Sequence, residues 1–137
     1  MQVRVVALVA ALVALAPGAR AEDSSSAQGI VASVESAQGR IARLLRAARA
    51  QSAGTQARCA DDGLSRVNAA LRYARIDARE WSAARARNDP DGARRAMLRL
   101  RAESDAAKRA STQVDTCFEL DRSADDRTEV RVIVDPG

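Results

Sequence analysis

The sequence contains no histidine, and 21 of its 22 basic residues are arginine. Histidine is the commonest general base and metal ligand, so its absence excludes Ser–His–Asp and Cys–His nucleophile systems. There is also no glycine-rich phosphate loop and no dinucleotide-binding fingerprint. The adjacent carboxylates Asp61 and Asp62, and Asp125 and Asp126, leave a glycosidase as a remote alternative, which would also need a cleft. We expect a protein that is not an enzyme, with no catalytic residues, no metal and no cofactor.

Aromatic residues are almost missing, since Tyr73, Trp81 and Phe118 are the complete set. A chain with so few large side chains is not expected to build a thick globular core. Thin packing of helix on helix through alanine and leucine suits this composition better.

Long apolar runs are confined to the N-terminus, where Val5–Ala16 follows the single positive charge of Arg4. This run is shorter than the roughly 20 apolar residues that a membrane-spanning helix needs. Pro17 and Gly18 follow it, and Ala19-Arg20-Ala21 then places small residues where signal peptidase requires them. The pattern predicts a signal peptide cleaved after Ala21, and the alternative is an uncleaved membrane anchor.

The predicted signal peptide divides the chain into an exported mature part and a segment that is removed. We expect residues 1–21 to be the signal peptide, 22–29 a polar linker, 30–122 a helical domain and 123–137 a charged linker with a Val-rich tail. The mature protein would be periplasmic or secreted, with no transmembrane anchor after cleavage. Val130–Val134 is either a short strand or a disordered tail.

Apolar residues recur at alternating steps of three and four in three successive segments, as in a coiled coil. The pattern predicts three helices. Their stripes are Ile30, Val34, Ala37, Ile41, Leu44 and Ala48; Leu64, Val67, Leu71, Ala74, Ala78 and Trp81; and Ala93, Met97, Leu100, Ser104, Ala107, Ser111, Val114 and Phe118.

Two breaks separate the stripes. Near residue 54, Gly54 is expected to end the first helix and Thr55 to cap the second. At residues 88–92, Asp89 is expected to cap the third helix, with Pro90 at its first position. Gly63 is expected to interrupt the second helix near its start.

The two cysteines, Cys59 and Cys117, are equidistant from residue 88, the first residue of the second break. Two antiparallel helices folded about that turn would bring both cysteines to the same height, about 40 Å from it at 1.5 Å per residue. Oxidation is expected in an exported protein. We predict a structural Cys59–Cys117 disulfide. Redox chemistry or metal binding is the alternative, although no CxxC motif and no histidine are present.

Arginine recurs at every third position in the first helix, at Arg40, Arg43, Arg46 and Arg49. A step of three drifts around the helix, so the row forms a slanting stripe. An arginine-rich surface can bind phosphate and carboxylate groups, which for an exported protein means anionic polysaccharide or lipid headgroups and not nucleic acid. The alternatives are a solvated flank and a coding bias toward arginine.

Residues 59–72, Cys-Ala-Asp-Asp-Gly-Leu-Ser-Arg-Val-Asn-Ala-Ala-Leu-Arg, resemble a stretch in a group of small exported helical proteins from deltaproteobacteria. Cys117-Phe118-Glu119 and the Val-rich tail would fill the group's later positions. Gly63 departs from the pattern, because a helix former would be expected there. The resemblance implies an exported, two-cysteine helical hairpin, and it carries over no active site.

We therefore predict an all-α fold, an antiparallel hairpin stapled by one disulfide with the first helix packed along it. This is either a slender three-helix bundle or a hairpin that completes its core by dimerising. The expected function is a structural or adaptor role in the cell envelope, through helix packing with a protein partner or with itself. The alternative is a binding module for anionic polymers or lipids.

Overall fold

The computed structural model describes residues 18–125, and for residues 18–25, 121, 124 and 125 it describes the backbone alone. Three helices fill this range: α1 (Gly18–Ala50), α2 (Gly54–Ala86) and α3 (Pro90–Asp125). Residues 18–125 contain no strand. The predicted all-α fold with three packed helices is confirmed. The predicted tail at Val130–Val134 lies outside the described residues.

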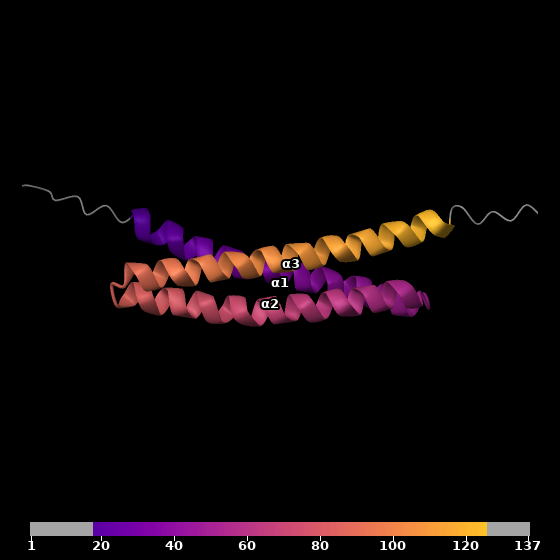
Figure 1. Ribbon diagram of the computed structural model, residues 1–137, viewed down its shortest axis with the longest axis horizontal. Coiled ribbons are helices and arrows are strands. Elements are labelled where there is room, and N and C mark those ends of the chain that lie inside the picture. The colour runs from indigo at the N-terminus through magenta and orange to yellow at the C-terminus, as the bar shows by residue number, and fades with distance from the viewer. Residues whose placement is uncertain (1–17, 126–137) are drawn as a thin grey trace, which may run out of the picture.

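The helices run up, down and up to form a slender bundle (Figure 1). The largest interface joins α2 and α3, which form the predicted hairpin, and α1 packs mainly against α2. The smallest interface joins α1 and α3. We call the end of the bundle at residues 87–89 the turn end and the opposite end, at Cys59 and Cys117, the disulfide end.

The turn between α2 and α3 follows the sequence prediction. The N–H of Gly92 donates to Oδ1 of Asp89 at 2.8 Å, so the Asp89 carboxylate caps α3, and Pro90 is the first residue of that helix. Asn88 ends α2 with a positive φ of 55°, a conformation that asparagine tolerates better than most residues. The N–H of Asp89 then reaches back to the carbonyl of Ala84 at 2.9 Å, which closes the helix end.

The turn between α1 and α2 differs from the prediction. Ser52, with a φ of 56°, takes the left-handed position that was expected of Gly54. The N–H of Ala53 donates to the carbonyl of Ala48 at 2.9 Å, so α1 ends in the same motif as α2. Gly54 is the first residue of α2, and its N-cap is Ala53 without a side-chain hydrogen bond. The expected cap by Thr55 is therefore wrong.

Two clusters of apolar residues form the core, one toward each end. Every residue of the three predicted stripes is buried or half-buried. A second face of α2 and α3, made of alanines, is buried as well. The cluster toward the disulfide end contains Val34, Ile41, Leu45, Ala60, Val67, Ala70, Leu71, Ala107, Ala110 and Val114. The cluster toward the turn end contains Ala27, Ala74, Trp81, Ala84, Ala93, Ala96 and Leu100.

The helices are longer than the predicted domain. Residues 22–29, expected as a linker, belong to α1. The reason is that Ala27 continues the apolar stripe by one step and is buried against the cluster around Trp81. At the other end, α3 continues through residues 123–125, which were expected to begin a linker.

Gly63 does not interrupt α2, which is continuous and buried at this position. A Cβ atom built on Gly63 would lie 2.3 Å from Cγ2 of Val114 on α3. The absence of a side chain thus allows the two helices to approach closely here. The expected interruption was wrong because the prediction considered helix propensity and not the neighbouring helix.

Candidate functional site

The predicted disulfide is present at the end of the hairpin opposite its turn. Cys59 and Cys117 are joined across α2 and α3, with their Cα atoms 6.5 Å apart. Both cysteines are half-buried. The described residues include no free cysteine, so this part of the chain offers no thiol for redox or metal chemistry.

An ion pair with a buried carboxylate lies between the same two helices, closer to the turn end. Nε of Arg99 donates to Oδ1 of Asp77 at 2.7 Å, and the Asp77 side chain is only 9% exposed. The other side of the guanidinium contacts the carboxylate of Glu80. The hydrogen bond to Asp77 is the main cause that raises the pKa of Arg99. Asp77 and Arg99 are equidistant from Asn88, like the two cysteines, so one register runs through the hairpin.

Glu103 lies one turn of helix beyond Arg99 and is half-buried. Its burial, and secondarily the negative charge of Asp77, raises the pKa of the Glu103 carboxyl above the ordinary value. A raised pKa can mark a functional acid. Here its causes are packing and the charge of a structural ion pair, so the shift belongs to the α2–α3 interface.

The structure divides the four arginines of the predicted row. Arg40 forms two hydrogen bonds with the carboxylate of Asp115 on α3, at 2.6 and 3.2 Å. Arg49 pairs with Asp61 on α2 at 3.2 Å. Arg43 and Arg46 are exposed and form no ion pair with the other described residues. The row is therefore not one continuous binding face, and Arg43 and Arg46 are the members left for an external anion.

The acidic pair Asp61 and Asp62 is occupied in the same way. Asp61 pairs with Arg49 at 3.2 Å, and Asp62 pairs with Arg66 at 2.8 Å within α2. Both carboxylates are exposed and point to arginines of the bundle, not toward one another across a cleft. Among the side chains that the structure describes, at residues 26–120, 122 and 123, no group of three or more acids or cysteines could hold a metal ion.

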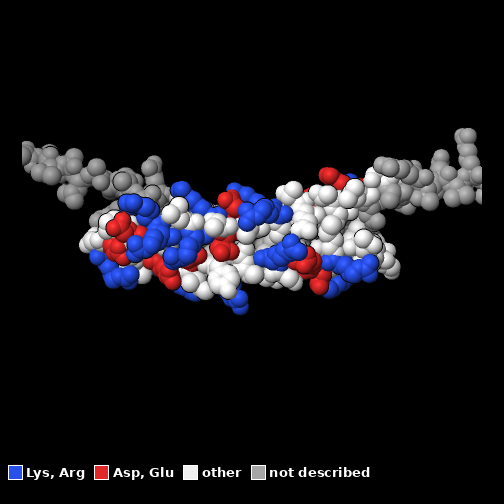
Figure 2. Space-filling view, viewed as in Figure 1, with Lys and Arg blue, Asp and Glu red and all other residues white. Residues whose placement is uncertain are grey.

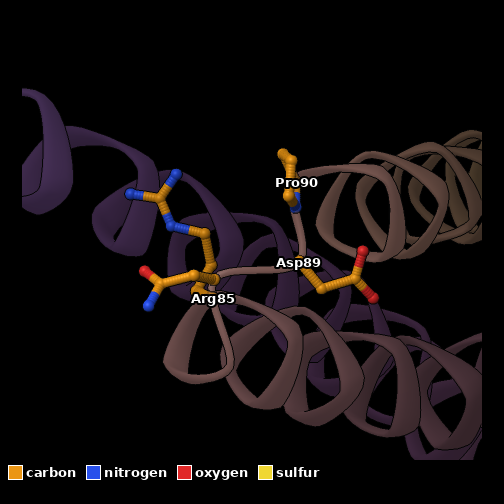
Figure 3. Close-up of a pocket in the computed structure, with 4 residues that line it drawn as sticks. Arg85, Asp89 and Pro90 are labelled. Atoms are coloured by element: carbon orange, nitrogen blue, oxygen red, sulfur yellow. The ribbon is translucent and has the colours of Figure 1, made fainter.

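A small notch lies at the turn itself, lined by Arg85, Asn88, Asp89 and Pro90, with a volume of about 210 Å³. Figure 3 shows the Asp89 carboxylate turned toward the first turn of α3, on the other side from the Arg85 guanidinium. Arg85 lies over the ring of Trp81, 5.6 Å from its centroid. In this notch, Asp89 thus caps α3 and Arg85 packs on the core residue Trp81.

A larger groove lies next to this notch. It has a volume of about 290 Å³ and is formed by the start of α3, by Trp81 and Arg85 of α2, and by Ser26 of α1. Leu98 on its edge is 59% exposed, whereas Trp81 is 6% exposed.

Figure 2 shows basic and acidic residues interleaved over the turn half of the visible face, and mostly uncharged surface over the second half of α3.

Trp81 and Met97 lie on the apolar stripes expected for the core, and the stripe pattern alone does not predict this groove. The missed signal is Leu98, a leucine next to the stripe residue Met97 and flanked by Arg94, Arg95 and Arg101. Its position off the stripe was compatible with exposure but did not decide it, since Leu45 also lies off the stripe and is buried.

None of the described helices is long and apolar enough to cross a membrane. Compared with known proteins, the chain matches no protein-family model, no curated protein and no solved structure.

Proposed function

We propose that the chain is an exported, non-enzymatic structural or adaptor protein of the periplasm or cell envelope, which acts through helix packing with a protein partner. One observation carries this proposal. Residues 26–120 contain few large apolar side chains, yet four of them are exposed: Tyr73, Ile76, Leu98 and Leu120.

These four residues lie on the outer faces of α2 and α3, while the core between the helices is filled largely by alanine. Leu98 and Leu120 are 59% and 65% exposed. Single exposed leucines are common on soluble proteins. Here they stand out because large residues are scarce, and surface leucines and tyrosines are well suited to pack against a partner's helix. The long helices α2 and α3 present them.

The experiment is a crosslinking pull-down from native cell envelopes, with the mature oxidised protein as bait and washes at low and high salt. Apolar helix packing resists salt, whereas binding to polyanions weakens steeply. A discrete protein retained at high salt supports the adaptor function. Recovery of glycan or lipid alone, lost at high salt, contradicts it.

Export is tested separately, by N-terminal sequencing of the protein recovered from its native envelope. Cleavage after Ala21 gives a mature chain that begins Glu22-Asp23-Ser24. A chain that retains residues 1–21 contradicts the signal-peptide part of the proposal.

Binding to anionic polysaccharide or lipid is a second candidate function. It is favoured by Arg43 and Arg46, which are exposed on α1 without an ion pair to another described residue. Their guanidinium groups match phosphate and carboxylate geometry. The low-salt and high-salt washes of the same pull-down distinguish this function from protein binding.

A further inference from the structure

The groove at the turn end combines an apolar floor with an exposed apolar edge. Trp81 and Ala93 are 6% exposed each and form part of the floor. Met97 is half-buried beside them, and Leu98 is 59% exposed at the edge. Its volume of about 290 Å³ lies at the lower end for small-molecule pockets. The groove therefore suits an inserted apolar side chain better than a whole organic ligand.

The rim of the groove is positive. Arg101 lines it and forms no ion pair with the other described residues. Arg94 also lines it, and its pair with Asp91 spans 3.6 Å with both side chains more than two-thirds exposed. Such an exposed pair contributes little free energy, so Arg94 can turn to a stronger acceptor. Arg95 adds a further exposed charge beside it.

This charge pattern argues against a second copy of the chain as the occupant. An antiparallel, two-fold contact centred on Leu98 would bring Arg95 of one copy opposite Arg101 of the other, and like charges across an interface cost free energy. A membrane surface is also a poor match. The apolar floor is recessed, and one exposed leucine inserts little area into a bilayer.

We propose that this groove binds an acidic amphipathic helix of a partner protein. An apolar side chain of that helix packs on Trp81, Met97 and Leu98, and its flanking carboxylates pair with Arg94 and Arg101. Apolar anchors surrounded by charges of complementary sign are the usual arrangement of a helix in a groove. This inference rests on the proposed adaptor function and assigns it a surface and a partner chemistry.

Trp81 is the single tryptophan of the chain and lies in the groove, so its fluorescence reports occupancy directly. The full mature protein, oxidised, is titrated with a helix-forming peptide that carries a leucine stripe flanked by glutamates. Two matched peptides replace the glutamates by lysines or the leucines by alanines. We expect the glutamate–leucine peptide to shift the Trp81 emission, and both matched peptides to bind at least tenfold more weakly.

Variants of exposed residues then locate the contact. Leu98→Asp and Arg101→Glu are each expected to weaken the peptide by about tenfold or more, and Arg101→Glu should improve binding of the lysine peptide. Ala69→Asp is the charge-matched control, since Ala69 is exposed on α2 and does not line the groove. It should leave the affinity unchanged. Circular dichroism confirms that each variant remains folded.

Four outcomes overturn the proposal. These are no emission shift with the glutamate peptide, equal binding of the lysine peptide, a shift with anionic phosphatidylglycerol vesicles in place of the peptide, or a shift of the protein alone that grows with its concentration. The pull-down separates this failure from that of the general proposal. If Leu98→Asp still retains the partner at high salt, the adaptor function stands and the groove is not its site.

Discussion

Gly63 is the residue at which helix propensity and packing oppose one another most directly. Alanine is favoured over glycine inside a helix by about 1 kcal/mol. At this position, however, a Cβ atom would lie 2.3 Å from Cγ2 of Val114, a residue that is fully buried. Neither partner can move freely, because one is backbone and the other a branched side chain in a packed core.

We expect Gly63→Ala to lower the free energy of unfolding by about 1–3 kcal/mol, the usual cost of overpacking. Urea denaturation followed by circular dichroism measures it. Gly29→Ala is the control, since a Cβ there meets no atom within 4 Å, and it should stabilise by about 0.5–1 kcal/mol. The double variant Gly63→Ala, Val114→Ala should be more stable than the sum of its single effects. A stabilising Gly63→Ala would contradict the close approach.

Glu103 predicts a pH dependence of stability. Its pKa is raised by burial and then by Asp77, so the folded state holds the proton to higher pH than the unfolded chain. The contribution of Glu103 to the free energy of unfolding is therefore fully present below the ordinary pKa of glutamate, and it is lost as pH rises through the raised pKa. Glu103→Gln removes this loss.

The measurement is the difference in free energy of unfolding between Glu103→Gln and the parent, taken at several pH values from acid to neutral. The difference should grow in favour of the variant as pH rises, and remain under about 1 kcal/mol because solvent screens a partly exposed charge. A difference that is constant with pH would contradict the shifted pKa.

Among the elements, the α2–α3 hairpin depends most on its covalent closure. The disulfide joins residues separated by 58 positions, which corresponds to about 4 kcal/mol in the chain-entropy model. The helices it joins are packed largely through alanine, whose burial contributes little apolar area per residue. We expect Cys59→Ser, Cys117→Ser to lose helicity at a far lower temperature than the parent.

Thermal melts followed by circular dichroism test the role of the disulfide, and hydrogen exchange locates its effect. Protection should fall first at the disulfide end of α3, because the α1–α3 interface is the smallest of the three, and the Arg40–Asp115 pair there is partly exposed. Reduction of the parent by dithiothreitol should reproduce the variant's melt. Superimposable melting curves for parent and variant would mean that the disulfide does not staple the hairpin.

The hairpin was predictable because its signals agree. A capping aspartate, a proline at the first helical position and two cysteines equidistant from the turn specify the same register. The α1–α2 turn was not, because Gly54 and Thr55 carry the residue types of a helix end while the backbone uses Ser52 and Ala53 instead. A turn at Gly54 and Thr55 and a turn at Ser52 and Ala53 are both compatible with the local sequence. The packing of α1 on α2 selects the second.

The sequence also did not predict which alanines are buried. Ala60, Ala70, Ala84, Ala96 and Ala110 are buried on α2 and α3 but were not on the predicted stripes. Alanine is common on buried and exposed helix faces alike in this chain, so it marks neither. The burial of Asp77 could not be predicted either, for a different reason. A charged residue is expected on the outer face of a helix unless its partner, here Arg99, is known.

For the molecule as a whole, the sequence left open a slender three-helix bundle or a hairpin that dimerises. The structure shows a three-helix bundle, in which α1 packs on the α2–α3 hairpin. α1 packs against both apolar clusters along the hairpin. The candidate surface was less predictable than the fold. The arginine row was visible as a pattern, but its division between α2, α3 and solvent depends on where Asp61 and Asp115 lie in the folded bundle.

That division separates two roles within one sequence pattern. Arg40 bridges α1 to α3 with two hydrogen bonds to Asp115, so Arg40→Gln should destabilise the bundle by about 0.5–1 kcal/mol. Arg43→Gln, Arg46→Gln removes exposed groups that form no ion pair with another described side chain, and should change stability by less than about 0.5 kcal/mol. Urea denaturation of both variants measures the contrast.

The contrast decides how a polyanion function can be tested. Substituting all four arginines would confuse lost binding with a loosened bundle, whereas Arg43→Gln, Arg46→Gln tests the surface alone. If anionic lipids bind here, the double variant should weaken binding to phosphatidylglycerol vesicles by about 1 kcal/mol for each arginine. Equal vesicle binding by parent and double variant excludes the row. Equal stability of Arg40→Gln and the parent would show that the Arg40–Asp115 pair does not hold α1 to α3.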